Sequence, residues 1–242
     1  MTSGLALPLK RFYSTRQAPC PYLPDRLERK VFTELVGGDR EPEALHETLT
    51  AAGFRRSHGI AYKPICQGCD SCVPVRVRTA EFEPNPSLRR VLIRNAEIAV
   101  AETGALATPE QFDLFARYEQ ARHAEGGMAS MDFDDYQAMV EESPIQTSLF
   151  EFRDPDGKLI AVALTDVMQD GLSMVYSFFE PGMARRSLGT YMILWHIHFA
   201  VGRGSTYLYL GYWIKESRKM AYKGRFTPLE RLGPDGWTPF VP

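Results

Sequence analysis

The order of hydrophobic and polar positions predicts two helices near the N-terminus, over 26–35 and 43–52. Glycines mark where both should end, the first helix at Gly37-Gly38 and the second at Gly53. A cysteine-rich loop and a short alternating strand over 73–77 come next. Ser87 is the expected N-cap of a third helix, which is expected to continue to Glu102.

A different pattern begins near Thr108. The segment Thr108 to Gln111 reads as a capping box with proline at the first helical position, so a helix through His123 is expected. Asp132 is expected to cap a short helix that ends at Glu142. Alternation and turn residues then predict strands, followed by a loop over 180–187, an apolar helix and a last strand. The strands are expected over 146–153, 158–167, 172–179 and 206–212, and the apolar helix over 188–201.

These patterns predict an α+β chain with two domains. Residues 1–105 would form an N-terminal, cysteine-bearing α/β domain, and residues 106–242 a second domain. The second domain has the order helix, helix, three strands, helix, strand. This is the order of a GNAT-like acyltransferase domain, and the likeness concerns the fold alone.

The composition is that of an ordinary globular protein, with 242 residues, 44% hydrophobic and 24% charged. The first residues lack the apolar run of a signal peptide, and no later stretch is long enough to cross a bilayer. We therefore expect a cytoplasmic protein with no membrane partner. The net charge of −2 argues against a chain that binds nucleic acid through its overall charge, although local basic patches can still hold a tRNA or form a solvated surface.

Cys66, Cys69 and Cys72 lie within seven residues, and Cys20 lies far upstream. In the cytosol these cysteines are expected to be thiols or metal ligands, not disulfides. Gly68 resembles the glycine of a metal knuckle, and four thiolates can hold zinc or an iron–sulfur cluster. The spacing does not choose between these two groups, and free thiols or a redox sensor remain an alternative.

Two further segments indicate binding of an anion. Arg186, Ser187 and Gly189 lie where a strand gives way to a helix, and a helix N-terminus attracts phosphate, although Ser187 can equally be a plain cap. The segment 207–226 interleaves tyrosines with cations, as single-stranded nucleotides require, or it is a core strand followed by an amphipathic helix. Its candidate tRNA-binding cations are Lys219, Lys223 and Arg225.

Segments spread over nearly the whole chain together resemble a known family. They are 19–24, 66–76, 87–90, 117–123, 175–179, 186–191, 209–213 and 219–223. The chain resembles the bacterial aspartate/glutamate leucyltransferases, relatives of the eukaryotic arginyl-tRNA–protein transferases. The resemblance implies transfer of leucine from leucyl-tRNA to the N-terminal amine of proteins that begin with Asp or Glu, which marks them for degradation in the N-degron pathway. It implies no cofactor for the chemistry.

Three alternatives stay open at this point. The donor can be arginyl-tRNA, because nothing physical in the sequence selects leucine. The chain can also be a GNAT N-acyltransferase that uses acyl-CoA, although such enzymes carry more glycines in the loop that 185–190 would form. Finally, it can be a metal-knuckle module that binds nucleic acid without catalysis.

The reaction needs an acceptor for the amine proton and a donor for the departing ribose oxygen. Asp166, at the end of an expected strand, is the candidate to hold or deprotonate the amine. Tyr212 is the candidate donor to the leaving oxygen, and Tyr176 is expected to line the same cleft. The alternative is a turn-starting Asp166 and two core tyrosines.

An acidic acceptor also needs a cation. Arg76 and Arg78 share one face of the strand over 73–78, and a guanidinium matches a carboxylate with two parallel hydrogen bonds. Arg122 and His123 are expected to complete this pocket. The alternative is that Arg76 and Arg78 form the solvent face of an edge strand.

Overall fold

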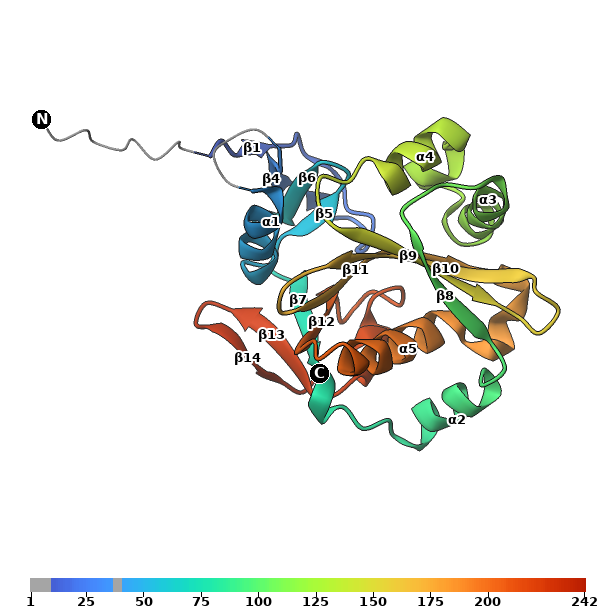
Figure 1. Cartoon of the computed structure of the whole chain (residues 1–242). Coiled ribbons are helices and arrows are strands. Elements are labelled where there is room, and N and C mark those ends of the chain that lie inside the picture. Colours follow the sequence, from blue (N-terminus) through green and yellow to red (C-terminus); the bar gives the residue numbers. More distant parts are fainter. Residues whose placement is uncertain (1–9, 37–40) are drawn as a thin grey trace, which may run out of the picture.

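A large sheet crosses the middle of the computed structural model, which describes residues 10–36 and 41–242 (Figure 1). Its pairs are antiparallel except for β11 and β12, which run parallel. In spatial order its strands are β14 (Gly236–Phe240), β13 (Leu229–Gly233), β7 (Val73–Arg78), β12 (Tyr207–Trp213), β11 (Gly171–Phe179), β10 (Leu159–Val167), β9 (Thr147–Arg153) and β8 (Ala99–Gly104).

Helices cover both faces of this sheet. One face packs against α5 (Leu188–Gly202), beside which lies α2 (Pro86–Arg94), and the other against α3 (Pro109–His123) and α4 (Phe133–Glu141). The strand β10 is buried from Leu159 to Asp166 because successive side chains enter opposite cores. Ala161 and Ala163 belong to the cluster around α5, while Val162 and Leu164 belong to the cluster around α3 and α4.

A smaller sheet lies at the N-terminal side of the molecule (Figure 1). Its order is β1 (Tyr13–Ser14), β4 (Lys30–Glu34), β6 (Ile60–Pro64) and β5 (Arg55–Ser57). The helix α1 (Pro42–Ala51) packs on it through Leu45 and Leu49, which form a core with Leu35 and Ala61. A separate pair joins β2 (Ala18–Pro19) to β3 (Leu27–Glu28).

Most expected elements from 108 to 213 are confirmed, in the expected order. Thr108 and Asp132 both form complete capping boxes. The expected loop over 180–187 contains a 3₁₀ helix, η3 (Pro181–Arg186), and three further short 3₁₀ helices are η1 (Thr79–Glu81), η2 (Gly127–Ser130) and η4 (Ala221–Arg225). The helix over 43–52 and the strand over 73–77 are confirmed as well.

Two expected helices are wrong. Residues 26–35 form β3 and β4, because Val31, Phe32 and Thr33 favour an extended chain once β6 is there to pair with it. The helix expected from Ser87 to Glu102 ends at Arg94, and its N-cap is Asn85. Residues 99–104 become β8, the edge strand beside β9. Gly37 and Gly38 lie outside the described residues.

The strand β7 lies between β12 and β13, so the large sheet includes residues from the first third of the chain. The boundary between 1–105 and 106–242 stays a prediction. Within 10–36 and 41–242, no helix is long and apolar enough to cross a membrane.

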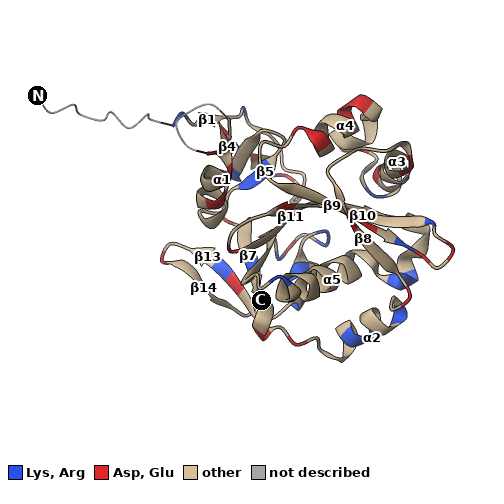
Figure 2. Cartoon of the chain, viewed as in Figure 1, with Lys and Arg blue, Asp and Glu red and all other residues tan. Residues whose placement is uncertain are grey.

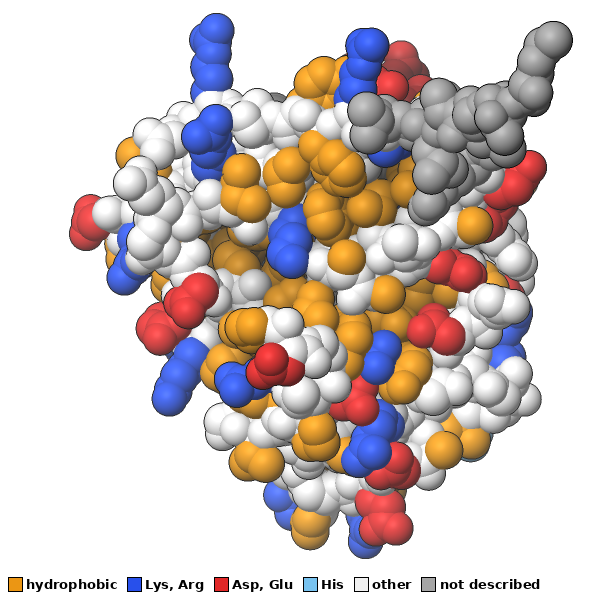
Figure 3. Space-filling model, turned by 90° about the vertical axis from the view of Figure 1, so that its left-hand side faces the viewer, with side chains coloured by type: hydrophobic (Ala, Val, Ile, Leu, Met, Phe, Trp, Pro, Cys, Tyr) orange, Lys and Arg blue, Asp and Glu red, His pale blue; other side chains and the backbone are white. Residues whose placement is uncertain are grey.

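Figure 2 shows basic residues along α2 and acidic residues along α4. In Figure 3, hydrophobic side chains gather near the centre of one face, with Lys and Arg beside them.

Candidate active site

A cavity of about 1000 Å³ opens between the small sheet and the large sheet. Strands β5, β11 and β12, helix α3, the start of α5 and the segment 218–223 contribute to its wall. Part of this wall is apolar and includes five methionines, which adapt to ligands of varied shape. The apolar residues include Met128, Met131, Met139, Leu164, Met174, Ile193, Leu210 and Met220.

The polar part of the cavity wall is basic. It contains six cationic side chains, namely Arg55, Arg56, Arg122, Arg218, Lys219 and Lys223. No Asp or Glu belongs to the wall within the described part of the chain. Of the six cations, Arg56 alone has a carboxylate within 4 Å among the described residues. A cavity with unpaired cations on its wall favours an anionic ligand.

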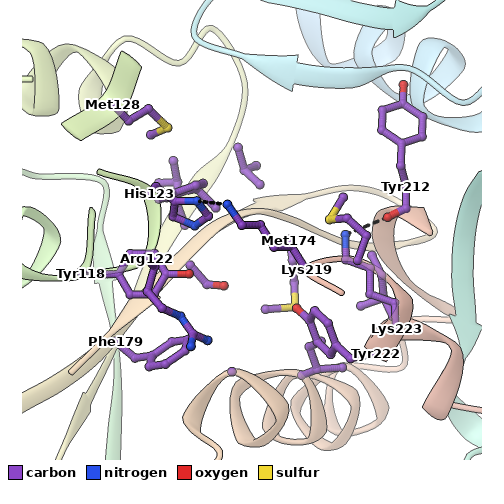
Figure 4. A pocket seen from close by; sticks show the side chains of 18 of the residues that line it. Tyr118, Arg122, His123, Met128, Met174, Phe179, Tyr212, Lys219, Tyr222 and Lys223 are labelled. Carbon is purple, nitrogen blue, oxygen red and sulfur yellow. Dashed lines mark hydrogen bonds between the residues drawn. The ribbon is translucent and has the colours of Figure 1, made fainter. Parts of the chain in front are cut away.

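Arg122, His123 and Lys219 lie together at one side of the cavity (Figure 4). The Nζ atom of Lys219 lies 3.1 Å from Nδ1 of His123, and Arg122 lies over the ring of Phe179. Burial lowers the pKa of His123, and the charges of Lys219 and Arg122 lower it further. The imidazole is therefore neutral at pH 7, and its Nδ1 accepts from the ammonium, so Nε2 carries the proton.

Tyr176 lines the cavity from β11, and its hydroxyl donates a hydrogen bond to Oε1 of Glu119 on α3. Glu119 is buried behind it and does not belong to the cavity wall. Burial raises the pKa of Glu119, while the bond from Tyr176 and the charge of Lys219 act in the opposite direction. Because its proton is donated to Glu119, the Tyr176 oxygen can accept a hydrogen bond from a ligand.

Asp166 lies elsewhere than expected. Its side chain is 0% exposed and does not line the cavity, because Arg56 covers it with bonds of 3.0 and 2.7 Å to Oδ1 and 2.9 Å to Oδ2. Thr147 donates to Oδ1, and His46 lies 3.3 Å from Oδ2. Burial raises the pKa of Asp166, but the bonds from His46 and Arg56 outweigh burial and hold the pKa below its usual value. This enclosed carboxylate has no access to a substrate amine, and we assign it a structural place.

Tyr212 borders the cavity, but its hydroxyl points away from it (Figure 4). The hydroxyl donates to the carbonyl of Gly53 at 2.9 Å. A donor already bound in this way does not reach a leaving oxygen. The backbone carbonyl of Tyr212 faces the cavity instead and accepts a hydrogen bond of 3.0 Å from Nζ of Lys223.

Arg76 and Arg78 lie outside the cavity wall. Arg76 is stacked between the rings of Tyr207 and Trp237, at 3.5 and 4.3 Å, and forms an ion pair of 2.7 Å with Glu230. Arg78 is paired with Glu81. Neither is on an edge strand, because β7 pairs with β13 on one side and with β12 on the other. Both guanidinium groups have carboxylate partners within the protein, so neither lies open to a substrate carboxylate.

Only some of the expected anion-binding residues line the cavity. Ser187, Gly189, Lys219 and Lys223 line the cavity, whereas Arg186 and Arg225 do not. Arg186 is paired with Glu97 at 2.8 Å, and Arg225 donates to Ser87. Ser187 has a left-handed backbone conformation and provides no side-chain cap for α5. Residues 187–190, at the start of α5, line the cavity.

All four cysteines line one small pocket beside β3 and β6. Cys66 accepts a hydrogen bond from the backbone N–H of Arg29, and Cys69 donates to Ser71. Burial, and after it the neighbouring thiols, raises the pKa of Cys72 to about 12. Within the described residues, no three side chains of His, Cys, Asp or Glu have the arrangement of a metal site. The expected metal or cluster stays a prediction.

The contribution of β5 and the residue after it was not predicted from the sequence. Arg55, Arg56 and His58 all line the cavity, and Arg56 also forms the buried ion pair. The run Arg55 to His58 follows the turn at Gly53 closely. This cluster of basic side chains beside a turn is the feature from which the sequence could have indicated the site. Tyr22 and Tyr62, from the N-terminal region, belong to the wall as well.

Comparisons with known proteins identify the family of the chain. The N-terminal profile of the arginine-tRNA-protein transferases matches residues 18–90, and the C-terminal profile matches residues 110–233. An aspartate/glutamate leucyltransferase of Paramagnetospirillum magneticum is 53% identical over 238 residues, which covers 97% of each chain. One of Parvibaculum lavamentivorans is 55% identical over 237 residues, which covers 98% of each chain.

Among solved structures, L-PGS from Bacillus licheniformis is 12% identical with a TM-score of 0.46, over 72% of this chain and 50% of that one. A likeness this small supports no conclusion. The two leucyltransferases, in contrast, match nearly the whole chain by sequence. The N-terminal profile includes β5, and the C-terminal profile includes most of α3 and the segment 218–223. The chain belongs to the arginine-tRNA-protein transferase family.

Proposed function

We propose that this protein transfers leucine from leucyl-tRNA to the N-terminal amine of proteins that begin with Asp or Glu, and so marks them for degradation. The observation that carries this proposal is the cavity wall, which combines unpaired cations with an apolar surface and contains no Asp or Glu within the described residues. The cations suit the phosphates of a tRNA acceptor end and an acidic acceptor. The methionine-rich surface suits a leucyl side chain, and the names of the relatives support the same donor and acceptors.

The proposed fold of the transferase half is GNAT-like. Three antiparallel strands, β9 to β11, are followed by α5 and by β12, which runs parallel to β11. Those two parallel strands pair only from Gly171 to Ser173 and separate beyond it. The cavity lies where they separate, because Met174 to Ser177 and Leu210 both line it.

The reaction needs little acid–base chemistry, because the donor is already an ester and an α-amine has a pKa of about 7.7–8.0. The amine nitrogen attacks the ester carbonyl carbon, and the bond from that carbon to the ribose oxygen breaks. The proton lost by the amine replaces the acyl group on the ribose oxygen. Alignment of amine and ester can supply most of the rate.

Two cavity residues suit these proton movements. The oxygen of Tyr176 can accept a hydrogen bond from the attacking amine, since its own proton is donated to Glu119. His123 is neutral and carries its proton on Nε2, from which it can donate to the ribose oxygen. Both replace the roles that the sequence suggested for Asp166 and Tyr212.

The direct test offers the protein radiolabelled leucyl-tRNA, arginyl-tRNA and acetyl-CoA, each with peptides that begin with Asp, Glu, Lys or Ala. We expect label to reach only the Asp and Glu peptides, and only from leucyl-tRNA. Transfer from acetyl-CoA, or equal transfer to all four peptides, would overturn the proposal. Transfer from arginyl-tRNA alone would keep the reaction and reassign the donor.

We further propose that Cys20, Cys66, Cys69 and Cys72 hold a zinc ion or an iron–sulfur cluster, with a role in shaping the N-terminal region. The support is that all four line one pocket. No step of the transfer runs through this group. Elemental analysis and absorption spectra of anaerobically purified protein are the test, together with the stability of Cys69→Ala. Fully active protein without metal or iron would contradict it.

A further inference from the structure

Two of the cavity cations, Arg55 and Lys223, meet at the same short stretch of β12. Nζ of Lys223 donates to the carbonyl of Tyr212. Arg55 packs on the preceding residue, Gly211, so closely that a Cβ added there would lie 2.8 Å from its Cζ and Nε atoms. Gly211 has a φ of +75°, a conformation that glycine adopts without strain. The backbone of β12 therefore brings both charges to one place.

The location of this pair is the point where the large sheet opens. Arg55 comes from β5 of the small sheet and donates to the carbonyls of Met174 and Val175, which lie just beyond the last residue of β11 that pairs with β12. Val175 is an extra residue in the ladder between β11 and β10, so its carbonyl is turned out of the regular pattern. The guanidinium group thus fills part of the gap between two separating strands.

The partners of the pair are neutral. Arg55 donates to two backbone carbonyls and to the hydroxyl of Ser173, and Lys223 donates to one carbonyl. A guanidinium has five N–H groups and an ammonium has three, so these bonds leave donors free on both side chains. No carboxylate in the described part of the chain lies within ion-pair distance of either one.

Two partly buried like charges without a counter-charge destabilise the free protein. Burial, and after it the charge of Arg55, lowers the pKa of Lys223 to about 7. An anion bound between the two groups would remove this penalty. A neutral ligand of the same shape would leave the penalty in place, so the site distinguishes charge as well as shape.

The pair differs from the other free cations of the cavity by its depth. Arg122, Arg218 and Lys219 are exposed, whereas Arg55 and Lys223 are partly buried. Exposed cations suit phosphates, which keep much of their water. A partly buried pair suits one compact anion, and a carboxylate on a short side chain has that size.

We propose that Arg55 and Lys223 form the subsite that binds the side-chain carboxylate of the acceptor's first residue, and that this pair sets the preference for Asp and Glu. The inference rests on the proposed function. It replaces Arg76 and Arg78, whose guanidinium groups are already paired with Glu230 and Glu81. Arg56, next to Arg55 on β5, acts as a positioning residue, because its bonds to Asp166 anchor that strand.

The test compares two peptides that differ only in an N-terminal Asp or Asn, which have nearly the same shape. The ratio of kcat/KM for Asp over Asn is measured for wild type, Lys223→Met and Lys223→Arg. We expect the ratio to fall by at least about 30-fold in Lys223→Met and to stay well above one in Lys223→Arg. An unchanged ratio in Lys223→Met overturns the inference.

Two controls separate this role from others. Lys219→Met should weaken tRNA binding and leave the Asp-to-Asn ratio unchanged, and Lys215→Met, an exposed lysine outside the cavity, should change neither. Thermal unfolding of Lys223→Met should occur at the wild-type temperature or above it, because an uncompensated charge has been removed. A Lys223→Met protein that fails to fold would therefore also contradict the inference.

A binding measurement keeps the inference apart from the proposed function. The Asp and Asn peptides are titrated calorimetrically into the protein without any tRNA. Preference for Asp that depends on Lys223 supports the subsite even if the wild type transfers no leucine, which would reject the proposed function alone. Equal binding of both peptides to a wild type that does transfer leucine would reject the subsite alone.

Discussion

Arginines occupy two kinds of surroundings in this molecule. On strand β7 of the large sheet, Arg76 is stacked between Tyr207 and Trp237 and paired with Glu230. Its positive charge therefore already has a partner within the protein and does not need a ligand. In the cavity, Arg55 has only carbonyls and a hydroxyl as partners. The difference shows that a cation's partners distinguish a structural role from a binding role better than its place in a sequence pattern.

Adjacent residues repeat this contrast on a smaller scale. Arg55 and Arg56 are neighbours on β5, and a strand directs successive side chains to opposite sides. Arg56 ends on the carboxylate of Asp166, and Arg55 ends in the gap between β11 and β12. One strand thus supplies both a buried ion pair that holds it in place and a free cation at the site.

The largest effect on stability is expected when Arg56 loses its partner Asp166. Asp166→Asn leaves the guanidinium buried without a counter-charge, and we expect a loss of about 3–5 kcal/mol in the free energy of unfolding, measured by denaturant titration. Asp156→Asn, at an exposed turn, is the control and should lie within about 0.5 kcal/mol of wild type. A stable Asp166→Asn protein with reduced turnover would instead restore a catalytic role to this residue.

Arg76→Ala tests the other arginine of the comparison. It leaves Glu230 unpaired and removes the stacked group between two rings, so we expect a stability loss of roughly 2 kcal/mol. The preference for Asp over Asn peptides, measured at a temperature where the variant is folded, should stay at the wild-type value. A lost preference would mean that the acceptor carboxylate is bound at Arg76 after all.

Lys219, an exposed cation of the cavity wall, is expected to contact a tRNA phosphate. In Lys219→Met, the slope of log K for leucyl-tRNA binding against log salt should become shallower by about 0.7–0.9 if one phosphate contact is lost. Filter binding at several salt concentrations gives this slope, and Lys215→Met is the matched control. Identical slopes in the two variants would remove Lys219 from the tRNA-binding surface.

The smallest expected effect concerns His123. Its pKa is lowered in the folded protein by burial and by Lys219 and Arg122, so the unfolded chain takes up this proton more readily. The contribution of His123 to stability is therefore present above the unfolded pKa of about 6.5 and is lost as pH falls below it. Wild type should lose more stability between pH 7 and 5.5 than His123→Gln does. An equal loss in both proteins would show that the imidazole is not affected by its neighbours.

Local signals predicted much of the fold from sequence. The capping boxes at Thr108 and Asp132, and the turn residues between β9, β10 and β11, act within a few residues of themselves and need no distant partner. The segment 30–34 was mistaken for helix because its partner strand, β6, lies about thirty residues further along the chain. Strand propensity depends on such a partner, which a local pattern does not contain.

The candidate site shows the same limit. Lys219, Lys223, Tyr176 and His123 were expected to be site residues because cations and aromatic residues cluster in the sequence and match the family's segments, and all four line the cavity. The sequence suggested tRNA binding for Lys223 and acceptor binding for His123, and both roles are reassigned above. The surroundings of Asp166 and Arg76 were not predicted, because their partners Arg56 and Glu230 lie 110 and 154 residues away. Burial and pairing of a charge depend on the tertiary fold.

The position of β7 has a consequence for how the chain folds during synthesis. This strand leaves the ribosome early, yet both of its neighbours, β12 and β13, come from residues 207–233. Contacts of such long separation form slowly, and until then β7 is an unpaired, largely apolar segment. Strand pairing in the large sheet can be completed only when almost the entire chain has emerged. Chaperone binding to the nascent protein should therefore concentrate on residues 73–78 and end as β13 emerges.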